Sequence, residues 1–234
     1  MKALLNKELK LCLHPTVFIY LGLVLMLLIP NYPYLASCFF LCNAIFFTFQ
    51  SSRENGDAMY TAMLPVSKAQ AVKARCLFVV LLQFAELLLM AGLCAFALAA
   101  MDLTTGNAGG TDHGLSLLAF ALILFAIFNL IFLPSYYKTG YKAGASFLKG
   151  AIGVWIWIVL CEGTMIASRV IAAEKGLDIP FFRFIHDCID CFPATKAAWT
   201  AQAILFAAAL LIYALSTLLA VRLSVKRYEL VDIQ

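Results

Sequence analysis

Four long apolar runs dominate the sequence, and each is long enough to cross a lipid bilayer as a helix. A spanning helix needs about 20 mostly apolar residues, and the runs cover residues 76–101, 115–137, 150–171 and 197–221. Hydrophobic residues make up 64% of the 234 positions and charged residues only 13%, whereas soluble domains have roughly 45–50% and about 25%. The sequence therefore predicts an all-α, polytopic membrane protein in which residues 1–234 form a single transmembrane domain.

The first 50 residues contain two shorter apolar runs, 17–29 and 35–49, separated by the sequence PNYP. This tetrapeptide is either a kink in one helix or a tight turn between two helices. Charge favours the turn, because only a turn brings 13 of the 17 basic residues to one side of the bilayer. These thirteen are Lys2, Lys7, Lys10, Arg53, Lys68, Lys73, Arg75, Lys138, Lys142, Lys149, Arg222, Lys226 and Arg227. We therefore expect six spans with both termini in the cytoplasm, and the net charge of +4 needs no nucleic-acid partner.

The N-terminal stretch MKALLNKELKLCLHP separates apolar and polar side chains onto two faces of a helix. The expected apolar face holds Leu5, Leu9, Cys12 and Leu13, and the expected polar face holds Lys2, Asn6, Lys7 and Lys10. Such a pattern predicts an interfacial helix that lies flat on the inner leaflet. A helical tail in solvent is the alternative.

The stretch from Glu54 to Cys76 is the one long segment of the first half that could lie in water. Asp57 is a candidate helix N-cap. Two pairs at i,i+4 spacing, Met59 with Met63 and Tyr60 with Leu64, form an apolar stripe on a two-turn helix. An isolated helix of this length is marginal in water. The stripe is therefore expected to lie against lipid, against the protein's own spans, or against another protein.

A second helix is expected directly after this one. Pro65 ends the first helix, and the sequence from Ser67 to Gln70 has the spacing of a capping box. The helix that starts there runs through Lys73 and Arg75 into the apolar run that follows. A movement of the short helix would therefore be passed to this span.

This layout resembles the membrane (permease) subunit of a bacterial type-two ATP-binding-cassette exporter. The shared features are an in-plane N-terminal helix, six spans, and a short loop helix followed by LPVSKAQAVKAR. The sequence PSYYKTGYKAG at 134–144 is similar to the signature P-L-Y-Y-K-F-G-Y of a small six-span branch of that family, with Ser135 and Thr139 in place of Leu and Phe. The resemblance implies the plasma membrane of a bacterial cell.

The resemblance also implies partners and a cofactor arrangement. The helix from Asp57 to Leu64, including Met59, Tyr60 and Met63, would be the coupling helix that docks on a cytoplasmic ABC ATPase subunit. None of the 13 glycines is followed by lysine, so the chain has no phosphate-binding P-loop. ATP and Mg²⁺ would then bind the partner ATPase, and this chain would hold no cofactor and be no enzyme. A second permease protomer, identical or different, would complete the transporter.

Polar residues deep within the apolar runs are candidates for a substrate pathway. Glu86 and Glu162 are expected near mid-bilayer, where a charge costs roughly 2.5 to 3.5 kcal/mol. Gln83 shares a helical face with Glu86, and Asn129 lies within the run 115–137. Each glutamate could face a pathway or be a neutral carboxyl that packs against a neighbouring helix.

The segment 176–196 between the last two runs is expected to form an amphipathic helix on the outer surface. It contains Cys188 and Cys191, which are compatible with a disulfide, with simple packing or, together with His186, with a metal. No catalytic set of side chains is recognisable. An exporter of peptide-like or drug-like substrates is the function that the resemblance implies, while a self-contained carrier or channel, or a membrane immunity or structural protein, remains the alternative.

Overall fold

The computed structural model describes the chain except for residues 1, 101–106, 108, 140–141, 176–195 and 231–234. The described residues form helices and no strands. The elements are α1 (Lys2–Lys7), η1 (Glu8–Cys12), α2 (Thr16–Gly22), η2 (Leu23–Leu28), α3 (Leu35–Glu54), α4 (Asp57–Met63), α5 (Lys68–Ala100), α6 (Leu115–Lys138), α7 (Ala143–Lys175) and α9 (Lys196–Glu229). The expected helix between α7 and α9, with Cys188 and Cys191, lies outside the described residues.

Five helices are long and apolar enough to cross a membrane, namely α3, α5, α6, α7 and α9. The first expected span is shorter, because α2 and η2 together cover only Thr16–Leu28. Seven residues of α-helix and six of 3-10 helix rise about 22 Å, against a hydrocarbon core of about 30 Å. The structure thus has five full-length candidate spans and one short apolar helix.

The sequence PNYP lies in a turn between η2 and α3, and not within one kinked helix. Asn31 adopts a left-handed conformation with φ of 58°, which asparagine tolerates better than most residues. The predicted turn between two helices is therefore confirmed.

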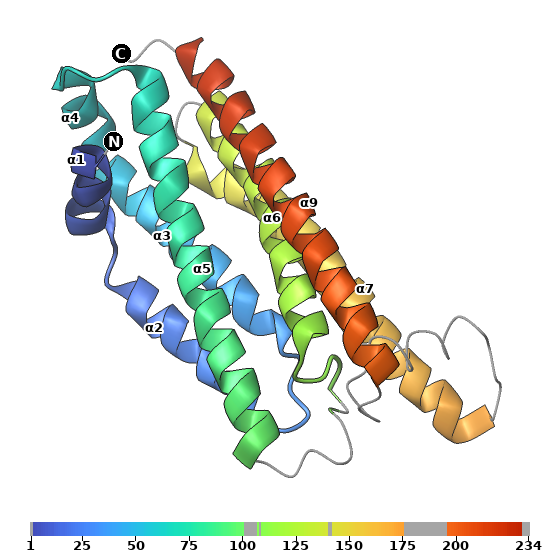
Figure 1. The fold of residues 1–234 in the computed structure, drawn as a ribbon. Helices are drawn as coiled ribbons and strands as arrows, with labels where there is room; N and C mark the ends of the chain where they lie inside the picture. The colour runs from blue at the N-terminus through green and yellow to red at the C-terminus, as the bar shows by residue number, and fades with distance from the viewer. Residues whose placement is uncertain (1, 101–106, 108, 140–141, 176–195, 231–234) are drawn as a thin grey trace.

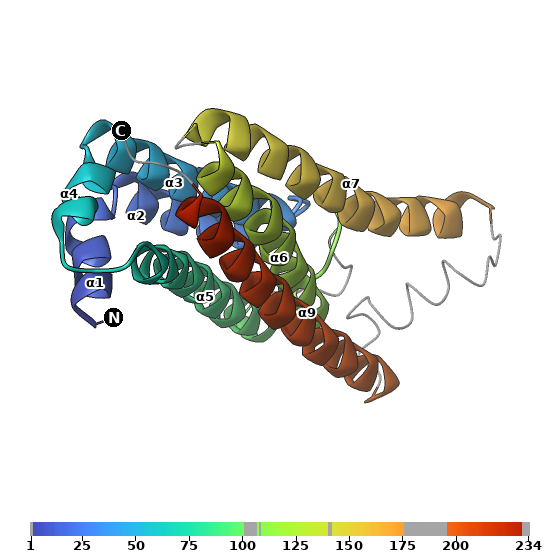
Figure 2. The ribbon, with the colours of Figure 1, turned by 90° about the horizontal axis from the view of Figure 1, so that it is seen from above.

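Helix α6 occupies the centre of the bundle and packs against α7 and α9 (Figure 1). Of its 24 residues, 17 are buried. Gly153 permits close approach of α7, because a Cβ at this position would lie only 2.8 Å from Ile131 Cδ1 and 3.1 Å from Ile127 Cγ2. Seen from above, α5 and α9 flank α6 on one side while α7 runs away from the bundle (Figure 2).

The two ends of the bundle are clearly distinct (Figure 1). Helices α1 and α4, the start of α5 and the C-terminal end of α9 gather at one end. The turn between η2 and α3 and the loop that precedes α6 lie at the other. In the orientation that the sequence predicts, these are the cytoplasmic and the outer end.

The N-terminal segment is helical, and it buries the expected face only in part, since Cys12 is buried and Leu5 and Leu13 are half-buried against the core. Leu4, Glu8 and Cys12, which are spaced four residues apart, are buried, whereas Leu9 is 41% exposed. Lys7, which we expected on the polar face in solvent, points into the protein with a side chain only 9% exposed. Lys7 and Glu8 point inward for an electrostatic reason, because both have charged partners on other elements.

Candidate functional site

The short helix α4 begins differently from the sequence-based expectation. Its N-cap is Gly56, in a left-handed conformation with φ of 66°, and Asp57 is the first helical residue and makes no side-chain cap. The prediction that Asp57 is the N-cap is therefore wrong. Leu64 lies beyond the helix in an extended conformation, so it does not continue the stripe of Tyr60. The glycine supplies no side-chain cap, but it adopts the positive φ with which the chain enters the helix without steric cost.

Asp57 instead belongs to a charged cluster that joins α4 to three other elements. Its carboxylate oxygens lie 2.6 Å from Lys7 Nζ and 3.0 Å from Arg75 Nη2. Arg75 Nη1 lies 2.9 Å from Glu8 Oε2 in an ion pair that lacks hydrogen-bond geometry. Arg75 Nη2 also donates to Ser52 Oγ of α3 over 2.7 Å. We call Lys7, Glu8, Asp57 and Arg75 the inner ion cluster.

The inner ion cluster is electrically balanced and largely shielded from solvent. Two cations face two carboxylates, and the side chains are 6–14% exposed. Burial alone would lower the pKa of Lys7, but the hydrogen bond to Asp57 and the charge of Glu8 raise it above its ordinary value. Lys7 Nζ also donates to Thr61 Oγ1 over 2.7 Å. Both turns of α4 are therefore tied to the N-terminal segment.

Glu8, Cys12 and Asp57 could be mistaken for a metal site, since their ligand atoms lie within 4.8 Å of one another. The two carboxylates already have cationic partners in Lys7 and Arg75. Burial raises the pKa of the Cys12 thiol to about 11, so it does not offer a thiolate at neutral pH. This trio does not fit a metal, and among the described residues it is the one cluster with suitable spacing.

The apolar stripe of α4 faces away from the protein. Met59, Tyr60 and Met63 are 65%, 52% and 74% exposed. The opposite face of the helix carries the contacts to the inner ion cluster. Because exposed apolar side chains gathered on one small helix mark an interaction surface, these three residues form the candidate contact with a partner.

The connection from α4 to α5 follows the predicted pattern. Ser67 Oγ accepts from the Gln70 backbone N–H over 3.2 Å, and Gln70 Oε1 accepts from the Ser67 backbone N–H over 3.2 Å. This reciprocal pair is the capping box that the sequence predicted. Helix α5 then continues for 33 residues, about 50 Å. The inner ion cluster is therefore attached through Arg75 to a helix long enough to span the membrane.

Two pathway candidates, Gln83 and Asn129, bind each other. Their amides form a reciprocal pair at 2.8 and 2.9 Å, and both are fully buried. Tyr213 of α9 donates its hydroxyl to Gln83 Oε1 over 2.8 Å, and Asn129 Nδ2 donates to Thr217 Oγ1 over 3.3 Å. This amide network joins α5, α6 and α9. Its polar atoms are satisfied by one another, so it is a structural connection.

Glu86 lies near the middle of α5 and is fully buried. Neither of its carboxyl oxygens has a hydrogen-bond partner within the described chain. Cys38 and Cys42 of α3 are neighbours of Glu86, but a thiol is a weak hydrogen-bond partner. A buried carboxyl without a partner is costly. Glu86 is therefore a fully buried carboxyl group whose burial no hydrogen bond within the described chain explains.

Glu162 lies at the outer end of the bundle and not near its middle. Its carboxylate accepts from the Leu35 backbone N–H over 2.9 Å and from the backbone N–H and hydroxyl of Thr111 over 2.6 and 3.1 Å. The carboxyl group thus lies at the N-terminus of α3, where the helix dipole favours its ionised form. The expected mid-bilayer depth of Glu162 is wrong, because α7 starts at Ala143, seven residues before the apolar run.

Further contacts surround Glu162 and join the same elements. Asp112 forms an ion pair with Arg169 of α7 at 3.0 Å, and His113 Nε2 bonds to the Leu27 carbonyl over 2.7 Å. Gly110 has φ of 141°, and a Cβ there would overlap the Glu162 carboxylate. We call the contacts of Glu162, Thr111, Asp112 and Arg169 the outer lock.

Two tyrosines of the sequence PSYYKTGYKAG, Tyr136 and Tyr137, lie near the inner ion cluster. Tyr136 packs edge-on against Phe49 of α3 at 4.8 Å between ring centroids, and Tyr137 packs against Tyr228 of α9 at 5.3 Å. Phe49 in turn lies beneath the Arg75 guanidinium at 5.1 Å. Tyr136 and Tyr137 therefore join α6 to α3 and α9, and Phe49 links this aromatic group to Arg75 of the inner ion cluster.

A family model described as ABC-2 family transporter protein matches residues 3–229. The chain belongs to this family. No curated protein and no solved structure matches it. The resemblance inferred from the loop helix and the tyrosine signature is thereby confirmed at the level of the family, and this ABC-2 transporter protein is a membrane-embedded transport subunit.

Several important residues of this ABC-2 transporter protein could not be identified from the sequence. Lys7 was assigned to the polar face of a surface helix, Glu8 was not singled out, and Arg75 was used only as a topology signal. Tyr213 and Thr217 are single polar residues in an apolar run. Each of these residues acts through a partner far away in the chain, so no pattern of neighbouring residues identifies it. The one available signal was Arg75, an arginine next to an apolar run.

Proposed function

We propose that this chain is the transmembrane subunit of an ATP-driven exporter and that α4 is its coupling helix. The observation that carries the proposal is the two-sided character of α4. Its outward face presents Met59, Tyr60 and Met63 to solvent, while its inward face is fixed by Asp57 to Lys7 and Arg75. A helix built only to pack on its own protein would bury the apolar face.

The partner we propose is a separate cytoplasmic ABC ATPase, since the family model supports a transport subunit and the chain lacks a P-loop. ATP and Mg²⁺ would bind that partner, and this chain would contribute no catalytic residue. Methionine and tyrosine suit a cleft between subdomains, because both offer a large contact area and methionine adapts to irregular surfaces.

Force applied to α4 would reach the membrane interior along a defined series of contacts. Asp57 holds Arg75 near the start of α5. Eight residues further along the same helix, Gln83 bonds to Asn129 of α6 and Tyr213 of α9. A shift of α5 would therefore displace α6 and α9 with it.

Glu86 is the pathway residue that we propose. In the described conformation its carboxyl has no partner, so this conformation does not satisfy the group. Movement of α5 relative to α3 would open the space beside Cys38 and Cys42 and let Glu86 meet substrate or water. Gln83 and Asn129 would hold the helices together, and Glu162 would fasten the outer end.

A second permease protomer, identical or different, would complete the transporter in the bacterial plasma membrane, with both termini and α4 in the cytoplasm. The gathering of α1, α4 and the C-terminal end of α9 at one end of the bundle supports this orientation (Figure 1). The substrate would move outward, and its class, peptide or drug-like, follows from the resemblance alone.

Replacing Met59, Tyr60 and Met63 together by aspartate tests the coupling assignment. Affinity-purified wild-type protein should bring down a soluble ATPase, and the triple variant should lose it, because three carboxylates would have to be desolvated in the contact. Membrane insertion should be unchanged. The double variant Arg53→Asp with Asn55→Asp is a matched control, since it alters exposed residues of the same loop and changes the net charge equally. If the triple variant keeps the ATPase, α4 is not the coupling helix.

A further inference from the structure

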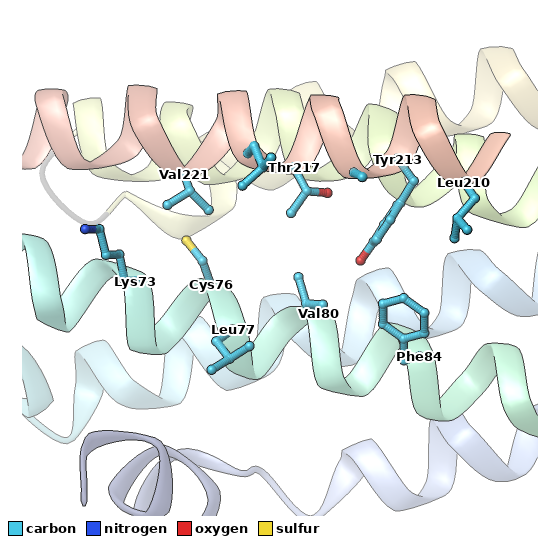
Figure 3. A pocket seen from close by; sticks show the side chains of 11 residues that line it. Lys73, Cys76, Leu77, Val80, Phe84, Leu210, Tyr213, Thr217 and Val221 are labelled. Atoms are coloured by element: carbon cyan, nitrogen blue, oxygen red, sulfur yellow. The ribbon is translucent and has the colours of Figure 1, made fainter. Parts of the chain in front are cut away.

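A groove runs between α5 and α9 on the side of the bundle away from α7. Its volume is about 510 Å³, which lies in the range of small-molecule sites. The walls are formed mostly by aliphatic and aromatic side chains (Figure 3). Leu77, Phe84, Leu210 and Leu218 line it and are still 39–60% exposed, so the groove opens sideways toward the surroundings of the bundle along its length.

The two hydroxyl groups on its wall are already engaged. Tyr213 donates to Gln83, and Thr217 accepts from Asn129. A polar occupant would therefore find few free partners along the groove. The interior of the groove suits a hydrocarbon chain. Such a chain cannot bond to polar groups, so unsatisfied polar groups on the wall would disfavour its binding.

One end of the groove carries a positive charge. Lys73 lies there beside Val221, whereas Phe84 and Leu210 lie at the opposite end (Figure 3). Lys73 is exposed, and it makes no ion pair with any described residue. This end faces α4, and it is the cytoplasmic end in the proposed orientation.

The length of the groove matches one leaflet of a bilayer. Lys73 and Phe84 are 11 residues apart on α5, about 16 Å along the axis. Half of the hydrocarbon core is about 15 Å thick. An acyl chain that begins at the level of Lys73 would therefore reach the mid-plane at Phe84.

We propose that this groove binds an anionic phospholipid of the inner leaflet, with one acyl chain between α5 and α9 and the phosphate against Lys73. The inference rests on the proposed function only for the assignment of the Lys73 end of the groove to the cytoplasmic side. A bound lipid would fill the space between two helices that meet through the amide network, and it would make their packing depend on membrane composition.

Native mass spectrometry of the full-length chain tests the proposal. The protein is reconstituted in nanodiscs that contain equal amounts of phosphatidylglycerol and phosphatidylcholine, and then released into detergent. The wild-type chain should retain one phosphatidylglycerol, whose mass identifies it. A phosphatidylglycerol with a photoreactive group in its acyl chain should crosslink to residues that line the groove, such as Val80 and Leu218.

Two variants with matched controls separate the acyl site from the headgroup site. Ala214→Trp fills the groove and should abolish retention, whereas Ala208→Trp on an exposed position of the same helix should not. Lys73→Ala should weaken retention of phosphatidylglycerol roughly fivefold. Lys149→Ala, an exposed lysine on α7, should leave it unchanged.

Equal retention by Ala214→Trp and Ala208→Trp would overturn the acyl site, and undiminished preference for phosphatidylglycerol in Lys73→Ala would overturn the role of the cation. Crosslinking of the groove to a second copy of the chain, with no lipid retained, would make it a protomer interface instead. Because the measurement needs no ATPase, its outcome is independent of the capture experiment on α4. The lipid site would stand even if the coupling assignment failed.

Discussion

Replacing Arg75 by methionine tests whether the inner ion cluster fixes α4 to the membrane domain. Arg75 is only 7% exposed and holds Glu8, Asp57 and Ser52 at once. Methionine retains much of the side-chain volume and removes the charge. Two largely buried carboxylates would then share Lys7 as their one cationic partner in the cluster.

The magnitude follows from the loss of one partner in a buried ion pair, which costs about 3–5 kcal/mol. For a chain of this length, 1 kcal/mol shifts Tm by roughly 2–4 °C, so we expect Tm to fall by about 6–20 °C. In proteoliposomes with the ATPase, ATP hydrolysis should continue while transport is lost, because α4 would move without displacing α5. Tryptophan fluorescence on heating and substrate uptake measure the two effects.

Two further variants separate charge balance from a general loss of packing. Arg53→Met removes an exposed arginine in the last turn of α3 and should change stability by no more than about 0.5 kcal/mol. Adding Glu8→Gln to Arg75→Met restores neutrality and should recover at least about 1 kcal/mol. If Arg75→Met has the Tm and the coupling of wild type, or if the double variant loses stability additively, the cluster does not hold α4.

Three other perturbations test separate parts of the structure. Glu86→Gln should lower export and substrate-stimulated ATP hydrolysis with assembly unchanged; wild-type export in Glu86→Gln together with lost assembly in Glu86→Leu would make the residue a packing carboxyl. Gly110→Ala should destabilise by about 1–3 kcal/mol, because its φ is 141° and a Cβ would overlap the outer lock, whereas Gly92→Ala, with open space around it, should keep the wild-type Tm. In a cysteine-free chain, a cysteine at Pro30 should react with an impermeant thiol reagent in whole cells and one at Ser67 should not; labelling of Ser67 would reverse the orientation.

Local sequence signals predicted local structure well. The capping box of Ser67 and Gln70, the end of α4 before Pro65 and the turn around Asn31 all depend on residues within four positions of one another. The continuity of α5 with the capping helix was also predictable, because nothing between Lys68 and the apolar run breaks a helix. These features are decided by backbone geometry that neighbouring residues set.

The site was less predictable, because its groups act across long sequence separations. Asp57 looked like a cap, yet its carboxylate is used by Lys7 and Arg75, 50 and 18 positions away. Gln83 and Asn129 were selected for the pathway because they are polar in apolar runs, and they prove to satisfy each other. Glu162 was misplaced because depth was counted from the edge of an apolar run and not from the true start of α7. The sequence therefore shows which residues of a membrane helix are polar, but the partner of each polar residue is found only in the three-dimensional structure.

The amide network divides the bundle into parts of unequal stiffness. Gln83, Asn129, Tyr213 and Thr217 pin the register of α5, α6 and α9, so sliding one of these helices by a turn would leave several polar atoms without partners at once. Between α5 and α3 at the level of Glu86, by contrast, thiols and a thioether provide soft contacts, including Cys38 Sγ to Met90 Sδ at 3.6 Å. We expect α3 and α5 to move relative to each other along that boundary, and substitutions that stiffen it should slow turnover without weakening any of the helices themselves.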